Sequence, residues 1–189
     1  PTLTPVPPTP TRTPTPTPIL ATKKVFVTST RSNGDLVAFV KTNIDANFTG
    51  DGLDAGDFIC QTRANAAALG GTWIAWLSSS SSDAKDRIGD YKYLRMDGSL
   101  VANGKADLTD GNISNPIEIN ENGAVITVDP IAWTATTSLG IRRPGTCIDW
   151  TSGSFPNGQL GYNSFANAEW TEGGSRSCDN LQNLYCFEQ

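Results

Sequence analysis

Alternating apolar and polar residues define the first elements of the chain. The run 24–29 (KVFVTS) is an alternating series of β-branched and aromatic residues, and it ends at the turn signal 32–35 (SNGD). This pattern predicts a strand followed by a turn. A second apolar run, 36–40, favours another strand, and the polar, Gly- and Asp-rich stretch 42–52 is expected to be a loop.

The clearest helical pattern follows that loop. Asp54 is the expected N-cap, Asp57 lies in the first turn where the helix dipole favours a carboxylate, and Gly70-Gly71 end the helix. One stripe at helical spacing contains Phe58, Ile59, Thr62, Ala66 and Leu69. The pattern therefore predicts one helix, and this helix carries Cys60.

The apolar run 72–77 (TWIAWL) predicts a buried strand. Five consecutive serines, Ser78 to Ser82, then open a long region without strong periodicity. Four turn dipeptides divide it: Asp97-Gly98, Asn103-Gly104, Asp110-Gly111 and Asn122-Gly123. We expect short strands and turns here rather than long elements.

The first 18 residues differ in composition from the rest. They contain eight prolines and seven threonines, and only Leu3, Val6 and Arg12 interrupt the pattern. Proline fixes its own φ and keeps the preceding residue extended, so the segment predicts a polyproline II rod of roughly 56 Å at about 3.1 Å per residue. We expect a Pro/Thr-rich arm over residues 1–22 and one globular domain over residues 23–189.

Composition argues against several classes of function. The chain has no histidine, which removes Ser-His-Asp and Cys-His nucleophiles and His-ligated zinc, so we expect no enzyme and no cofactor. The net charge is −5, and the 14 Lys and Arg are scattered singly or in pairs, which argues against nucleic acid as a partner. No apolar run is long enough for a membrane span. Because the sequence begins at Pro1 without Met or an apolar leader, we expect either a processed chain or a recombinant piece of a longer one.

Cysteine spacing indicates the compartment. Cys60, Cys147, Cys178 and Cys186 lack the CxxC spacing of zinc or redox sites, the closest pair being eight apart. Two disulfides are the better interpretation, and four cysteines allow three connectivities. With the Pro/Thr-rich arm, they predict a secreted protein that is extracellular or attached to a cell surface.

The order of these features resembles that of a C-type lectin-like domain. In that fold a cysteine-bearing helix is followed by a core strand of the "WIGL" type, a long loop region, a strand with the second cysteine, a Trp-bearing strand, the third cysteine and a last strand with the fourth. The corresponding residues here are Cys60, Trp73 to Leu77, Cys147, Trp170, Cys178 and Leu184 to Glu188. The resemblance covers roughly residues 24–189 and says nothing about the arm.

More narrowly, the chain is similar to a bacterial family of secreted lectin-like domains of unknown function. The motifs that carry this similarity are 25–29, 57–60, 93–98, 106–111, 133–134 and 184–189. Relative to that family, the stretch 36–51 resembles an insertion in a shorter turn.

The resemblance implies a fold and a disulfide pattern. The fold is α+β, with mixed short antiparallel strands, one or two helices and a long loop region. The implied disulfides join Cys60 to Cys186 and Cys147 to Cys178. The alternating runs 25–27 and 185–187 at the two ends of the domain agree with it, because their pairing would bring those ends together.

The calcium site of sugar-binding C-type lectins is not intact. Thr171 and Glu172 follow Trp170 where those proteins have Asn-Asp, and the only proline in a comparable context is Pro116. A stretch that begins like an EF-hand loop at Asp45 has Gly at its twelfth position in place of Glu. We therefore expect no metal ion.

Two tryptophans lie beside carboxylates, an arrangement that suits stacking on a sugar and recognition of its hydroxyls. The candidate ligand-binding residues are Asp149, Trp150, Glu169, Trp170 and Glu172. The competing interpretation is a core position, which we favour for Trp73, Trp76, Trp133 and Trp170, and which is more open for Trp150. The pairs Asp107/Asp110 and Glu169/Glu172 have a spacing that suits loop solvation as well as a glycosidase.

The arm suggests how the domain is used. Its candidate O-glycosylation sites are Thr9, Thr11, Thr13, Thr15 and Thr17, and Asn47 and Asn112 begin N-glycosylation sequons. Its candidate assembly anchors are Leu3, Val6, Ile19 and Leu20. Because the rod is much longer than the domain's expected radius of gyration of about 15–16 Å, it can lie along another copy. We expect an adhesive or structural subunit of a surface assembly such as a filament, with itself, glycans or a surface receptor as partners. The alternative is a free lectin on a glycosylated stalk.

Overall fold

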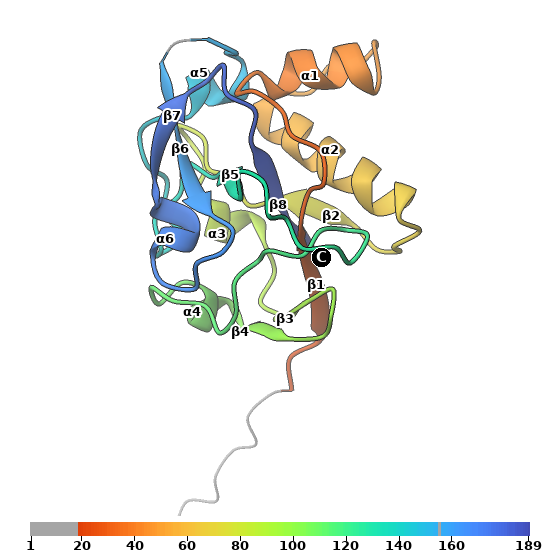
Figure 1. The fold of residues 1–189 in the computed structure, drawn as a ribbon, viewed down its shortest axis with the longest axis vertical. Coiled ribbons are helices and arrows are strands. Elements are labelled where there is room, and N and C mark those ends of the chain that lie inside the picture. Colours follow the sequence, from red (N-terminus) through yellow and green to blue (C-terminus); the bar gives the residue numbers. More distant parts are fainter. Residues whose placement is uncertain (1–18, 155) are drawn as a thin grey trace, which may run out of the picture.

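The computed structural model describes residues 19–154 and 156–189, so the predictions for the arm up to Pro18, including Leu3, Val6 and the five threonines, lie outside the described residues. Helices and strands alternate around one curled sheet (Figure 1). The helical segments are α1 (Leu36–Asn43), α2 (Gly52–Ala66), α3 (Ala84–Arg87), α4 (Lys105–Leu108), α5 (Cys147–Trp150) and α6 (Glu169–Glu172). The strands are β1 (Thr22–Val27), β2 (Trp73–Ala75), β3 (Lys92–Arg95), β4 (Leu100–Asn103), β5 (Ile131–Trp133), β6 (Asn157–Tyr162), β7 (Gly174–Ser177) and β8 (Asn183–Glu188).

Strands β1 and β8 form the centre of the sheet. They pair antiparallel, with Val25 opposite Phe187 and Phe26 opposite Cys186, which confirms the predicted pairing of the two ends of the domain. Alternate side chains face opposite sides of the sheet: Phe26 and Cys186 join one core cluster, whereas Val25 and Phe187 join the other. Both faces of these strands are therefore buried, which accounts for their continuous apolar sequences.

The strand order is β4-β3-β1-β8-β5-β6-β7, and β2 also pairs with β8. Two of these pairs, β1 with β3 and β5 with β8, are parallel, so the expectation of antiparallel strands is only partly correct. The parallel pairs arise because long connections, rather than tight hairpins, join their strands. The mixed α and β composition agrees with the prediction.

The helical content differs from the predicted one or two helices. The run 36–40 lies in α1, so the predicted strand is wrong; the Asp35 side chain accepts a hydrogen bond from the Ala38 amide at 2.8 Å, and Leu36 and Val40 are buried one turn apart. Helix α2 begins three residues before the predicted start, because Asp51 is its N-cap and Asp54 closes a capping box with it. The remaining helices have four residues each.

Two disulfides cross-link the domain. Cys60 of α2 is bonded to Cys186 of β8, and Cys147 of α5 is bonded to Cys178, which follows β7. This is the connectivity that the lectin-like resemblance implied. Two other implications of that resemblance differ: Cys147 and Trp170 lie in the short helical segments α5 and α6, not in strands.

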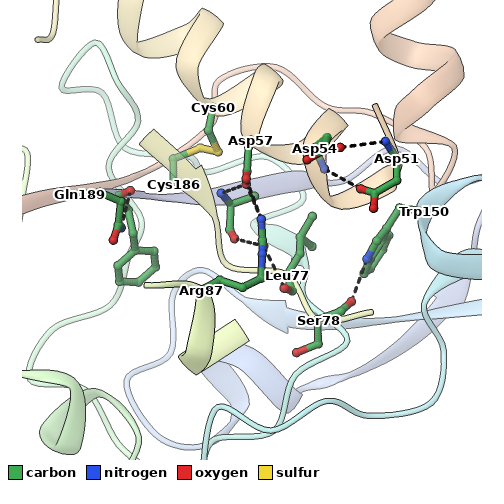
Figure 2. A network of polar contacts seen from close by, with 12 residues as sticks. Asp51, Asp54, Asp57, Cys60, Leu77, Ser78, Arg87, Trp150, Cys186 and Gln189 are labelled. Atoms are coloured by element: carbon green, nitrogen blue, oxygen red, sulfur yellow. Dashed lines mark hydrogen bonds and ion pairs between the residues drawn. A yellow bond between two sulfur atoms is a disulfide. The ribbon is translucent and has the colours of Figure 1, made fainter. Parts of the chain in front are cut away.

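An ion pair connects α3 to α2, and both of its side chains also hydrogen-bond to the end of β2 (Figure 2). The Arg87 Nη2 group donates to both oxygens of Asp57 at 2.7 and 2.8 Å, and its Nη1 group donates to the carbonyls of Ala75 and Leu77. Burial raises the pKa of Asp57, although Arg87 and the Ala75 amide oppose this effect. The pair fixes the end of β2, where the serine loop (residues 78–82) begins.

Candidate functional site

The most unusual backbone in the described chain lies at α5. Cys147, Ile148, Asp149 and Trp150 have φ angles of 49°, 55°, 50° and 65°, so these four residues form a left-handed turn. None of them is glycine, and each such residue costs roughly 1–2 kcal/mol relative to a right-handed conformation. Strain of this kind persists only where surrounding contacts impose it, and it is concentrated at functional sites.

Contacts on several sides hold the left-handed turn. Cys147 is fixed by its disulfide, and the buried indole of Trp150 donates to the Ser78 carbonyl at 2.8 Å (Figure 2). The N-terminus of α2 packs directly against the turn, because a Cβ atom at Gly52 would lie 2.0 Å from the Asp149 carbonyl oxygen. Only glycine allows this approach at position 52.

The turn directs the Asp149 carboxylate at the serine loop. One carboxylate oxygen accepts from the Ser80 amide at 2.7 Å, and the other accepts from the Ser80 hydroxyl at 2.6 Å. Burial acts to raise the pKa of Asp149, but the hydrogen bonds from Ser80 and Thr146 outweigh it, and the pKa is lowered. Asp149 is therefore ionised at neutral pH and holds the loop as an anion.

A pocket of about 390 Å³ lies between the serine loop and the segment 142–146. Its lining residues are Ser79, Ser80, Arg142, Arg143, Pro144 and Thr146. The volume is within the range of small-molecule sites. The lining combines hydroxyl groups, two guanidinium groups and one apolar ring, so the pocket is equipped for a polar ligand with many hydrogen-bond acceptors.

The two guanidinium groups retain free donors. Arg142 contacts Asp83 at 3.3 Å and Arg143 contacts Glu172 at 3.7 Å, and their side chains are 51% and 44% exposed. Within the described part of the chain, the Arg143 guanidinium has no hydrogen bond. By contrast, the facing carboxylates are occupied, since Asp83 accepts from the Arg142 amide and Glu172 accepts from the Ser138 hydroxyl.

The tryptophan side chains predicted to stack on a sugar are not accessible to a ligand. Trp150 and Trp170 are fully buried, as are Trp76 and Trp133, and Trp73 is nearly so. Trp150 packs against Trp133, and Trp170 packs against Trp76, with ring centroids 6.2 and 5.3 Å apart. The core position favoured for Trp73, Trp76, Trp133 and Trp170 is confirmed, and Trp150 is a core residue as well. The candidate role of Trp150 and Trp170 in stacking on a sugar is therefore wrong, because each indole fills the core.

Two of the predicted carboxylates contact residues that line the pocket. Asp149 holds Ser80, and Glu172 contacts Arg143, so both act from behind the lining side chains. Glu169 is exposed and has no such role. The carboxylates of Asp107 and Asp110 accept from the amides of Asn103 and Asn112, which agrees with loop stabilisation.

Sequence reasoning missed the lining residues. Two features of the sequence could have indicated the pocket: the run of five serines, and Arg142-Arg143, which is the single adjacent pair of arginines in the chain. Nothing in the sequence places these two segments side by side.

Other predicted positions are located as follows. Both sequon asparagines, Asn47 and Asn112, are exposed. The Asp45 side chain accepts from the Asn47 amide, and Gly56, the twelfth position of the EF-hand-like stretch, lies inside α2. Across residues 19–154 and 156–189, no group of three or more His, Cys, Asp or Glu is placed to hold a metal ion, and no helix has the length and apolarity needed to cross a bilayer.

Comparison of the sequence with protein-family models and with curated proteins gives no match. The similarity to C-type lectin-like domains is therefore carried by the quoted motifs alone.

Proposed function

We propose that this protein is an extracellular, non-catalytic C-type-lectin-like module that acts as a structural or adhesive subunit of a cell-surface assembly, joined through its Pro/Thr-rich arm. The two disulfides support folding in an oxidising compartment. The occupied carboxylates and the polar, guanidinium-lined pocket suit binding better than chemistry.

The place where the arm joins the domain is the observation that carries the proposal. The chain enters β1 at the end of the molecule opposite α5 (Figure 1). Leu20 lies against Gly104, and the Ala21 carbonyl accepts from the Lys92 amide at 2.9 Å, so the domain holds the chain from residue 20 onward. Ile19 is fully exposed. The pocket, whose lining includes the α5 N-cap Thr146, therefore lies away from the end at which the described chain enters the domain.

A groove on the domain offers a surface for the arm of another copy. It has a volume of about 470 Å³ and is lined in part by Phe48, Phe58 and Asp54. The two phenyl rings lie 5.4 Å apart. Polyproline segments bind aromatic-lined grooves at low entropic cost, and Asp54 complements Arg12, the single charge among residues 1–18. Such a head-to-tail contact is heterologous and propagates as a ring or a filament.

Deletion of residues 1–18 tests the proposal. We expect the full chain to form oligomers that grow with concentration, and the truncated chain to remain a folded monomer with both disulfides, because every cysteine lies downstream of the cut. Size-exclusion chromatography with light scattering and electron microscopy measure the difference. Phe48→Ala should shift assembly to higher concentration, whereas Phe165→Ala, at an exposed ring outside the groove, should not. Identical monomers from the full and truncated chains would overturn assembly by the arm.

The second candidate function is a free lectin displayed on a glycosylated stalk. The pocket beside α5 favours it, because hydroxyl and guanidinium groups converge there on a space of saccharide size. In that case the full chain is a monomer and the arm is cleaved at once by a protease.

A further inference from the structure

We propose that the pocket between the serine loop and residues 142–146 binds a saccharide that carries a carboxylate, such as a uronic acid residue. This inference rests on the non-catalytic binding role proposed above, but it does not depend on assembly by the arm. It assigns a ligand class to the pocket, which neither the sequence motifs nor the lectin-like resemblance does.

Arg143 is the group that would recognise the carboxylate. A guanidinium is planar and presents paired N–H donors that match the two oxygens of a carboxylate. The Arg143 guanidinium is free of hydrogen bonds within the described residues, and Glu172 lies 3.7 Å from it. Glu172 is itself fixed by the Ser138 hydroxyl at 2.7 Å, so it positions Arg143 without saturating it.

The rest of the lining suits a hydroxylated ring. Ser80 and Thr146 bring hydroxyl oxygens to the wall of the pocket, and both are tied to Asp149, so the left-handed turn sets their positions. Arg142 keeps donors on its exposed side. Pro144 contributes an apolar face against which the C–H groups of a sugar ring can pack.

Local charge excludes a simple polyanion site. The two positive charges of Arg142 and Arg143 are outnumbered by the three carboxylates of Asp83, Asp149 and Glu172. A ligand recognised only by its charge would gain little here, whereas a bidentate contact with one carboxylate depends on geometry. Binding should therefore weaken only slightly between low and physiological salt, in contrast to binding of a polyanion by counterion release.

The experiment titrates the full-length protein with a galacturonate disaccharide and follows saturable chemical-shift changes by NMR. Two matched probes are a galactose disaccharide of the same linkage, which lacks the carboxylates, and acetate, which lacks the sugar. We expect both to bind at least tenfold more weakly than the galacturonate disaccharide. Arg143→Lys keeps the charge but removes the planar donor pair, and it should reduce affinity at least tenfold. Arg176→Lys is the control, because that exposed arginine pairs with Asp129 outside the pocket.

Several results of this titration would overturn the inference. Absence of saturable shifts, equal binding of the galactose disaccharide, or equal affinity of Arg143→Lys would each overturn the inference. Acetate binding as tightly as the galacturonate disaccharide would also overturn it, because the sugar would then contribute nothing. Light scattering on the same samples reports assembly, so assembly without binding refutes this inference alone, and binding without assembly refutes the role of the arm alone.

Discussion

The two disulfides anchor regions of opposite character. Around Cys60–Cys186, the backbone is regular: α2 has a capping box, β8 pairs on both sides, and the Arg87–Asp57 pair joins α3 to α2. Around Cys147–Cys178, the backbone is a left-handed turn followed by loops, and its conformation depends on residues far away in the sequence. The first region follows local rules of folding, whereas the second violates them.

This difference indicates where each kind of task is placed. The regular region uses hydrophobic burial, capping and hydrogen-bonded strands, which are the ordinary sources of stability. The irregular region holds about 4–8 kcal/mol of backbone strain if each of its four residues costs roughly 1–2 kcal/mol. The candidate pocket lies beside the strained turn. The region whose backbone conformation lowers the stability of the fold is therefore the one that presents polar groups to a ligand.

Removing each disulfide in turn gives the largest expected effect. The loop closed by Cys60–Cys186 spans 126 residues and the other spans 31, for which chain entropy predicts about 5 and about 4 kcal/mol. We expect the Cys60→Ala/Cys186→Ala variant to lose close to the full amount. The Cys147→Ala/Cys178→Ala variant should lose clearly less than the about 4 kcal/mol that chain entropy predicts for it, because the strained turn can then relax. Urea unfolding of both variants and the parent measures the two losses.

The difference between the two losses is the informative quantity. If the second variant loses its full entropic amount of about 4 kcal/mol or more, the turn is not under strain and the contrast between the regions disappears. Saccharide titration of the second variant adds a check, since relaxation of the turn should also displace Ser80 from the pocket.

The regular region was largely predictable from the sequence. Strand β1, helix α2 and the pairing of β1 with β8 depend on alternation, helical spacing and capping residues, all of which are local signals. Helix α1 was missed because five adjacent apolar residues carry no clear period, and the Asp35 cap that distinguishes helix from strand was assigned to a turn. The short span of that run left helix and strand indistinguishable.

The candidate site was not predictable to the same degree. Asp149 and Glu172 were predicted to bind a ligand, and both lie behind the residues that line the candidate pocket. The tryptophans beside them are buried in the core, and the arginines that line the pocket were passed over. A left-handed conformation at Ile148 contradicts its local preference. Tertiary contacts with Gly52, Ser78, Ser80 and Cys178 impose it, and those partners are distant in sequence.

Replacement of one arginine in the regular region and one in the irregular region should lower stability by different amounts. Arg87→Met should destabilise the protein by about 3 kcal/mol, the lower end for a broken buried pair, because the Asp57 side chain is partly exposed. Arg142→Met removes an exposed ion pair with Asp83 and should cost less than about 1 kcal/mol. Denaturant unfolding at neutral pH measures both. Equal losses would show that the Arg87–Asp57 pair does not anchor the regular region.

The smallest effect is also the most direct test of strain. Ile148 has a φ of 55° and its side chain is 62% exposed, so Ile148→Gly removes about 1–2 kcal/mol of strain and sacrifices little burial. The added freedom of glycine in the unfolded chain costs about 0.5–1 kcal/mol, which leaves a net stabilisation of about 0.5–1 kcal/mol. Ile141→Gly is the matched control: this exposed isoleucine has no positive φ, so the same change should destabilise by about 1 kcal/mol. The two substitutions remove the same side chain from the same irregular region and should shift the urea midpoint in opposite directions. A shift in the same direction would mean that the turn at α5 is at its conformational minimum, and the pocket beside it would then owe nothing to stored strain.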